Sequence, residues 1–228
     1  MGHSFDLDTV AGLFQDGEPS VCNAEGDYYL QSSEFDDLDA AADVKARAEI
    51  LLVRVNGIGR VLDPSYRPVE LTGRFITPDG GSAVVLAVVA AEARIRAQSV
   101  GLVVNGEPVS PPPPRGPKYV ALARNDTNVA EALAHIASGL DLVSLYKVYE
   151  VIRDDLGDLR AILDAGLASR NEISRFTAGA NRPEASGPAA RHARFSGDGP
   201  RNPMDQSEAR RFTLDLVRRW MDTKLPSD

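Results

Sequence analysis

Residues 142–155 read LVSLYKVYEVIRDD, and this stretch determines the class of the second half of the chain. Its apolar side chains recur every three or four residues, which places them on one broad face of a helix. That face holds Leu142, Leu145, Tyr146, Val148, Tyr149 and Ile152. Gly157 follows at the position where helices often end in a left-handed residue. The stretch therefore predicts an amphipathic helix that packs against a core.

Helical signals continue on both sides of this stretch. A residue that caps a helix start is followed three positions later by Glu at three places, a pattern typical of helix N-termini. These pairs are Asn128 with Glu131, Ser169 with Glu172, and Asp205 with Glu208. A short helix is predicted over residues 159–167. In the last helix Phe212, Leu216 and Trp220 fall four apart, so we expect Trp220 to be buried. We predict a helical module over residues 126–228.

Upstream of residue 126 the pattern favours strands. Apolar and β-branched runs are separated by turn sequences, of which Asn105-Gly106 is typical of a two-residue hairpin. The predicted strands lie within residues 50–55, 69–77, 82–97, 102–109 and 119–123. A polyproline loop over residues 110–117 precedes the last of them. We therefore predict an α+β fold. An antiparallel β-rich module over residues 45–125, a small sandwich or curled sheet, is followed by the α-helical C-terminal module.

Charge is distributed unevenly along the 228 residues, whose net charge is −8. Residues 1–44 hold eleven Asp and Glu and no Lys or Arg, so they account for more than the whole deficit. Residues 169–228 hold eleven basic and eight acidic residues, a net charge of +3. Blocks of like charge repel one another and are commonly solvated. We predict that residues 1–44 form an acidic, loosely attached arm.

Composition excludes several classes of protein. The longest apolar run, Ala83 to Ala91, has nine residues, whereas a membrane-spanning helix needs about 20. The first residues lack the basic and apolar parts of a signal peptide. Cys22 is the one cysteine, so no internal disulfide forms. The three histidines and Cys22 lack the spacing of metal ligands. We expect a cytoplasmic protein with no cofactor, no metal and no membrane contact.

Candidate site residues gather in one loop between predicted helices, residues 180–194. This loop is rich in Gly, Pro and Ala and carries the binding candidates Asn181, Arg182, Arg191 and Arg194 together with the candidate catalytic residue His192. Arginine binds phosphate through two parallel hydrogen bonds, and histidine exchanges a proton near neutral pH. A structural interpretation stays open, in which Asn181 caps a helix, the arginines pair with acids and His192 packs on the bundle.

Three segments resemble a group of bacterial proteins of uncharacterised function. They are LYKVYEVIRDD (residues 145–155), FTAGANRP (residues 176–183) and ARHAR (residues 190–194). The resemblance covers about the second half of the chain and implies no activity. The helical half is also similar in outline to HEPN-type ribonucleases, in which an Arg and a His act together. The matching pair here is Arg182 and His192, with nine residues between them, a wider spacing than in that family.

Two functions follow from these observations. The first is a binding or regulatory protein that acts through another protein or through self-association. The alternative is a phosphodiesterase, ribonuclease or nucleotide-binding protein. In it His192 acts as general acid and base, while the basic C-terminal segment meets a nucleotide or nucleic acid.

Overall fold

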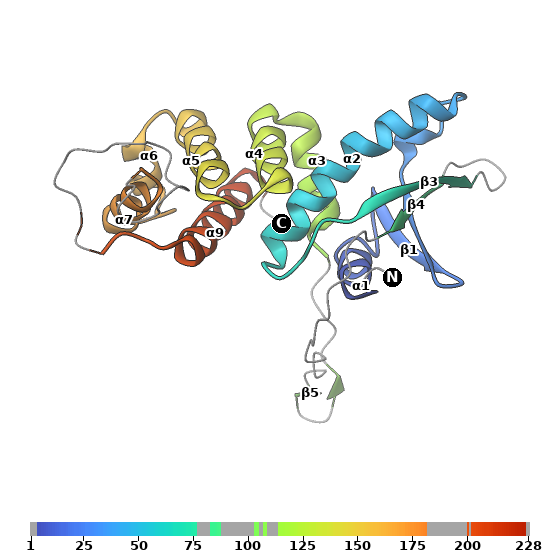
Figure 1. Ribbon diagram of the computed structural model, residues 1–228, viewed down its shortest axis with the longest axis horizontal. Helices are drawn as coiled ribbons and strands as arrows, with labels where there is room; N and C mark the ends of the chain where they lie inside the picture. The colour runs from blue at the N-terminus through green and yellow to red at the C-terminus, as the bar shows by residue number, and fades with distance from the viewer. Residues whose placement is uncertain are drawn as a thin grey trace. The chain divides into compact units, whose positions relative to one another are not determined.

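The chain forms two compact units in the computed structural model (Figure 1). The structure describes residues 4–76, 83–87, 103–104, 107–108, 114–181, 200 and 202–226. The first unit combines residues 1–48 with 69–117, and the second combines residues 49–68 with 118–228. No helix in the described ranges is both long enough and apolar enough to cross a membrane.

The first unit is built on a four-stranded antiparallel sheet with the strand order β1-β2-β4-β3. Helix α1 (Ser4–Leu13) packs on β1. The ladder of β3 against β4 shifts register between Leu71 and Phe75, where Gly73 takes a positive φ of 75°. The strands are β1 (Ser20–Ala24), β2 (Asp27–Gln31), β3 (Glu70–Ile76) and β4 (Ala83–Ala87). A separate pair joins β5 (Val103–Val104) to β6 (Glu107–Pro108), as the Asn105-Gly106 hairpin predicts.

The N-terminal segment is folded and does not form a loose arm. Phe14, Leu30 and Phe35, the last in the short helix η1 (Ser33–Phe35), are fully buried. Several of its carboxylates accept local hydrogen bonds, since the Tyr28 hydroxyl donates to Asp8 and the Ser32 hydroxyl donates to Glu18. The prediction of a loose arm was wrong because acidic residues on the surface of a small folded core give the same sequence pattern as a solvated arm.

Helix α2 (Ala41–Leu62) replaces the strand predicted over residues 50–55. Leu51, Val55 and Ile58 are fully buried, and their spacing follows the helical period. Gly57 does not break the helix. A Cβ there would lie 2.5 Å from the carbonyl oxygen of Leu133, so glycine allows the backbone of α4 (Thr127–Ser138) to approach closely. The β-branched run is thus part of a helix that buries one face and leaves Ile50 and Val53 exposed.

The second unit is helical. Its aromatic core joins three helices, because the Phe176 ring lies 5.7 Å from Tyr149 and 5.2 Å from Phe212, measured between ring centroids. Trp220 is fully buried, as predicted. Besides the second part of α2, the unit contains α3 (Gly116–Asn125), α4 (Thr127–Ser138), α5 (Leu142–Leu156), α6 (Leu159–Asp164), α7 (Arg170–Asn181) and α9 (Gln206–Lys224).

Two further local predictions are wrong and others are confirmed. Residues 119–123, predicted as a strand, lie in α3, so the change to helix comes before residue 123. The cap of α4 is Asp126 rather than Asn128.

Other local predictions are confirmed: the helix over residues 142–155, its end at Gly157, and the capping pairs at Ser169 and Asp205. The α+β class, with sheet residues in the first half and helices in the second, is confirmed. Residues 77–82 and 88–100, which include a predicted turn and part of a predicted strand, lie outside the described residues.

Candidate functional site

The loop predicted as a site falls almost entirely outside the described residues. Asn181 is the last residue of α7. Arg182, Arg191, His192 and Arg194 belong to residues 182–199, which the structure does not describe. That these residues share one site therefore stays a prediction.

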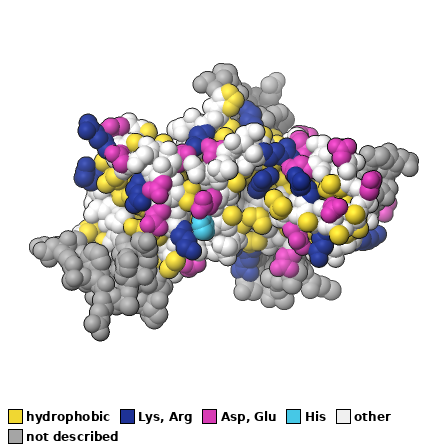
Figure 2. Space-filling view, turned by 90° about the horizontal axis from the view of Figure 1, so that it is seen from above, with side chains coloured by type: hydrophobic (Ala, Val, Ile, Leu, Met, Phe, Trp, Pro, Cys, Tyr) yellow, Lys and Arg dark blue, Asp and Glu magenta, His cyan; other side chains and the backbone are white. Residues whose placement is uncertain are grey.

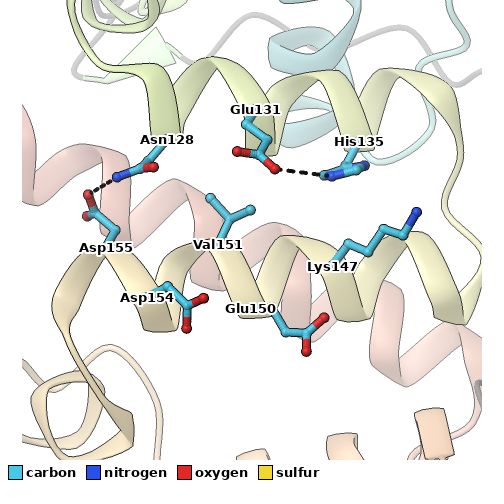
Figure 3. A pocket seen from close by; sticks show the side chains of 8 residues that line it. All are labelled: Asn128, Glu131, His135, Lys147, Glu150, Val151, Asp154 and Asp155. Atoms are coloured by element: carbon cyan, nitrogen blue, oxygen red, sulfur yellow. Dashed lines mark hydrogen bonds and ion pairs between the residues drawn. The ribbon is translucent and has the colours of Figure 1, made fainter.

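The described residues instead form an open groove between α4 and α5 (Figure 3). Its volume is about 620 Å³. Helix α4 contributes Asn128, Glu131 and His135, and helix α5 contributes Lys147, Glu150, Val151, Asp154 and Asp155. Figure 3 shows the side chain of Val151 pointing into the space between the two helices, with charged side chains on either side.

The groove exists because α4 and α5 form an antiparallel helical hairpin. Asn128, near the start of α4, donates through Nδ2 to Oδ1 of Asp155, near the end of α5, over 2.7 Å. The turn between the helices is short because Asp141 caps α5 directly, accepting from the backbone N–H groups of Val143 and Ser144 at 3.0 Å each. Leu145 and Ile152 on the inner face of α5 are fully buried, so the polar side chains point outward.

Charge changes sign along the groove. Lys147 and His135 lie toward one end, and Asp154 and Asp155 lie toward the other (Figure 3). His135 Nε2 is 3.8 Å from Oε1 of Glu131, one turn earlier on the same helix. The lining thus holds four carboxylates against one lysine and one histidine, so its overall charge is negative.

Asp155 belongs to the structural framework of the groove. Its side chain is 13% exposed, and Oδ2 accepts from Lys224 Nζ at 2.7 Å and from Trp220 Nε1 at 2.9 Å. Burial alone would raise the pKa of Asp155, but the hydrogen bonds from Lys224, Asn128 and Trp220 outweigh it and hold the pKa below its ordinary value. Lys224 also donates to Asp126, the cap of α4, at 2.6 Å. These contacts join α4, α5 and α9.

The acidic end of the groove is already occupied by partners within the chain. Asp154 accepts a hydrogen bond from Arg153 at 2.9 Å. Asp155 accepts from Lys224 and Trp220. Asp158 caps α6 by accepting from the backbone N–H of Ala161. Hard cations need several convergent oxygen ligands. Among the residues that the structure describes, no group of three His, Cys, Asp or Glu side chains is arranged to hold a metal ion.

Sequence reasoning did not single out the groove, although a signal was present. Lys147, Glu150, Val151 and Asp154 follow the spacing i, i+3, i+4 and i+7 on the side of α5 opposite its apolar face. Asn128, Glu131 and His135 follow the same period on α4. Every amphipathic helix has such a polar face, so the pattern alone does not distinguish a groove from an ordinary solvated surface.

Comparisons with protein-family models, with curated protein sequences and with solved structures found no match to this chain. The resemblance of residues 145–155, 176–183 and 190–194 to a bacterial group therefore stays a prediction, as does the similarity in outline to HEPN-type proteins.

Proposed function

We infer that this chain is a non-catalytic binding protein, and that the groove between α4 and α5 receives a segment of a protein partner. The observation that supports this most is the groove itself, an open channel along a helical hairpin with Val151 between its polar walls. Two antiparallel helices offer a groove that a third, amphipathic helix can occupy through residues spaced i, i+3, i+4 and i+7.

The lining favours binding over catalysis. Its eight residues include no Ser, Thr, Cys or Tyr that could act as a nucleophile beside His135. The carboxylates at the acidic end are engaged with Arg153 and Lys224 rather than converging on a shared point. Such a surface can recognise a partner by shape and charge without chemistry of its own.

The charges indicate the chemistry of the partner segment. Lys and Arg side chains of the partner would face Glu131, Glu150 and Asp154, while an acidic side chain would face Lys147. An apolar side chain between them would cover Val151, which is only partly buried. Helix α4 has 12 residues, or about 18 Å at 1.5 Å per residue, so the groove accommodates about three turns of helix.

The surface supports a protein partner rather than a nucleic acid. Nucleic-acid binding depends on a continuous basic surface that neutralises phosphates. On the face seen in Figure 2, acidic and basic side chains are interspersed with small apolar areas. The groove carries more acids than bases, and carboxylates repel a phosphate backbone.

The proposal is tested by placing a photo-crosslinking amino acid at position 151, in the groove, and expressing the full chain in cells of the source organism. We expect one dominant crosslinked partner, identified by mass spectrometry. The same amino acid at position 160 on α6 is the control, because the Arg160 side chain is 84% exposed and is not one of the residues that line the groove. A product with twice the mass of the chain would identify the partner as a second copy.

Reversing one charge in the groove then distinguishes specific recognition of the partner from random crosslinking. Lys147→Glu should abolish the crosslink at position 151, and the matched variant Arg160→Glu should leave it unchanged. Binding of the purified partner, measured by calorimetry, should fall at least tenfold for Lys147→Glu and weaken as salt rises. Equal crosslinking at positions 151 and 160, or a product that is insensitive to Lys147→Glu, would overturn the proposal.

A further inference from the structure

Helix α2 carries an exposed apolar strip formed by Ala42, Ala46, Ile50 and Val53. Ile50 is 54% exposed and Val53 is 41% exposed, and they lie on adjacent turns of the helix. Ala42 and Ala46 precede Ile50 at intervals of four residues and are also exposed, so the strip follows the helical period. A single exposed apolar side chain is ordinary on a protein surface, whereas a continuous strip favours an interaction.

A helix already packs on the continuation of this strip. Gly57 lies four residues after Val53, on the same face of α2, and the backbone of Leu133 in α4 lies against it. A small residue at such a position lets two helix backbones approach closely. Ala42 and Ala46 are also small, so the exposed strip suits a second helical surface.

The strip cannot reach the groove of its own chain. Leu133 comes two residues after Glu131 and two residues before His135, and two residues turn an α-helix by about 200°. The side of α4 that meets α2 is therefore opposite the side that lines the groove. A strip can occupy a groove between α4 and α5 only in a second copy of the chain.

The strip and the groove match in length and in apolar contact. From Ala42 to Val53 the strip covers about 18 Å at 1.5 Å per residue, which is also the length of α4. Val151 points into the space between the two helices of the groove and is only partly buried (Figure 3). Placing Ile50 of a second copy against Val151 removes two apolar side chains from water, which favours association.

Charges along the two surfaces are opposite in sign. One side of the strip carries, in order, an acid and two bases, which are Asp43, Arg47 and Arg54. The α5 wall of the groove carries, in order, a base and two acids, which are Lys147, Glu150 and Asp154. With α2 running in the direction of α5 and Ile50 over Val151, each charge beside the strip lies within about 5 Å of its opposite, measured along the helix axis. Long Lys and Arg side chains span such an offset, so the surfaces are complementary in this register.

We propose that this chain associates with itself head to tail, and that the α2 strip of one copy occupies the groove between α4 and α5 of the next. The inference rests on the proposed function of the groove and names its partner segment. The strip and the groove are different surfaces, so the contact is heterologous and either closes into a ring or grows into a longer assembly. Three turns of helix form a small interface, so association is weak and depends on concentration.

Sedimentation velocity of the purified full chain measures this association. We expect the average mass to rise with concentration and to fall at high salt, because salt screens the ion pairs. Ile50→Glu, which places an acid against an acidic groove, should weaken association at least tenfold. Ala121→Glu on α3 is the matched control, because Ala121 is exposed and belongs to neither surface. A native chain that stays monomeric at about 1 mM, or equal association of the two variants, would overturn the proposal.

Mixing two variants tests the head-to-tail arrangement. Ile50→Glu disables the strip and leaves the groove intact, whereas Lys147→Glu disables the groove and leaves the strip intact. Neither variant should associate alone. An equimolar mixture should form a one-to-one complex, because the Lys147→Glu chain supplies its strip to the groove of the Ile50→Glu chain. A mixture that stays monomeric would show that the strip and the groove do not pair.

The partner crosslinked from position 151 distinguishes this inference from the function on which it rests. A crosslink to residues 42–54 of another copy would support both. A crosslink to a different protein, with a purified chain that stays monomeric, would leave the binding function of the groove standing and remove the second copy as its occupant. Crosslinking no stronger at position 151 than at position 160 would overturn both.

Discussion

The indole Nε1 of Trp220 donates a hydrogen bond to Oδ2 of Asp155 over 2.9 Å, which joins the last helix of the chain to the end of α5. Lys224 reinforces the junction, because its Nζ contacts the same oxygen at 2.7 Å and lies 4.8 Å from the centroid of the Trp220 ring. One carboxylate thus satisfies an indole, an ammonium and, through Oδ1, the side chain of Asn128. Its position also fixes the acidic end of the groove.

Asp155→Asn should lower the free energy of unfolding by about 1–3 kcal/mol, because the buried donors of Lys224 and Trp220 lose a charged acceptor. Urea denaturation followed by circular dichroism measures the change. Asp154→Asn is the matched control on the same helix. Its carboxylate is 69% exposed and pairs with the neighbouring Arg153, so its loss should change stability by less than about 0.5 kcal/mol. Equal effects of the two variants would show that the junction does not stabilise the fold.

The same junction predicts how stability depends on pH. The pKa of Asp155 is held below its ordinary value, so its contribution is present above the unfolded pKa and is lost as pH falls through the folded one. The stability difference between the native chain and Asp155→Asn should therefore shrink below about pH 4. The pKa of Lys224 is raised by Asp126 and Asp155 despite its burial, so its contribution is present below the unfolded pKa and is lost above about pH 10.5. A stability difference between the native chain and Asp155→Asn that stays constant from pH 2 to pH 6 would contradict this account.

Trp220 is the one tryptophan in the chain and is fully buried, so two substitutions separate its packing from its hydrogen bond. Trp220→Ala should cost about 3–5 kcal/mol through the cavity that it leaves. Trp220→Phe keeps an aromatic ring but removes the donor to Asp155, and should cost about 1–3 kcal/mol. Thermal melting followed by circular dichroism measures both. If Trp220→Phe melts with the native chain, the indole hydrogen bond contributes nothing.

Local signals in the sequence predicted the helices that carry the groove. The apolar period of residues 142–155 and the left-handed Gly157 identified α5, because a helix that buries one face must repeat that face along the sequence. The capping pairs at Ser169 and Asp205 were identified for a similar reason, since both partners lie within four residues. Features that depend only on near neighbours in sequence were predictable.

Features that depend on contacts between residues far apart in the sequence were not predictable. Residues 50–55 are β-branched and apolar, and such a run is typical of a strand and equally of a buried helix. Glycine is common in turns, and nothing in the sequence shows that the backbone of Leu133 approaches Gly57. The groove and the pairing of Asp155 with Lys224, 69 residues apart, likewise depend on how α4, α5 and α9 pack. No local pattern contains that information.

Gly57→Ala tests the close approach of α2 and α4. Alanine is the better helix former, so at an unobstructed position the change should stabilise by about 1 kcal/mol. At Gly57 the new Cβ would meet the carbonyl oxygen of Leu133 at 2.5 Å, and we expect a net loss of about 1–3 kcal/mol, measured by urea denaturation. Gly12→Ala in α1 is the control, because nothing lies within 4 Å of its added Cβ. Two variants of equal stability would show that α2 and α4 are not in close contact.

The loop of residues 181–194 provides the last test, because it separates the proposed binding function from the alternative of a phosphodiesterase or ribonuclease. If His192 transfers a proton and Arg182 holds a phosphate, then His192→Ala and Arg182→Ala should each abolish hydrolysis of a short RNA while leaving the melting temperature unchanged. Residues of one catalytic unit give non-additive losses, so the double variant should be no worse than either single variant. Arg170→Ala, on the first turn of α7, is the control for the loss of one positive charge.

If instead Arg182 and His192 are structural, each substitution should lower the free energy of unfolding by about 1–3 kcal/mol. RNA hydrolysis by the purified native chain that survives in a stable double variant would eliminate the loop as a catalytic site. The binding function would be unaffected, because the groove between α4 and α5 contains neither residue.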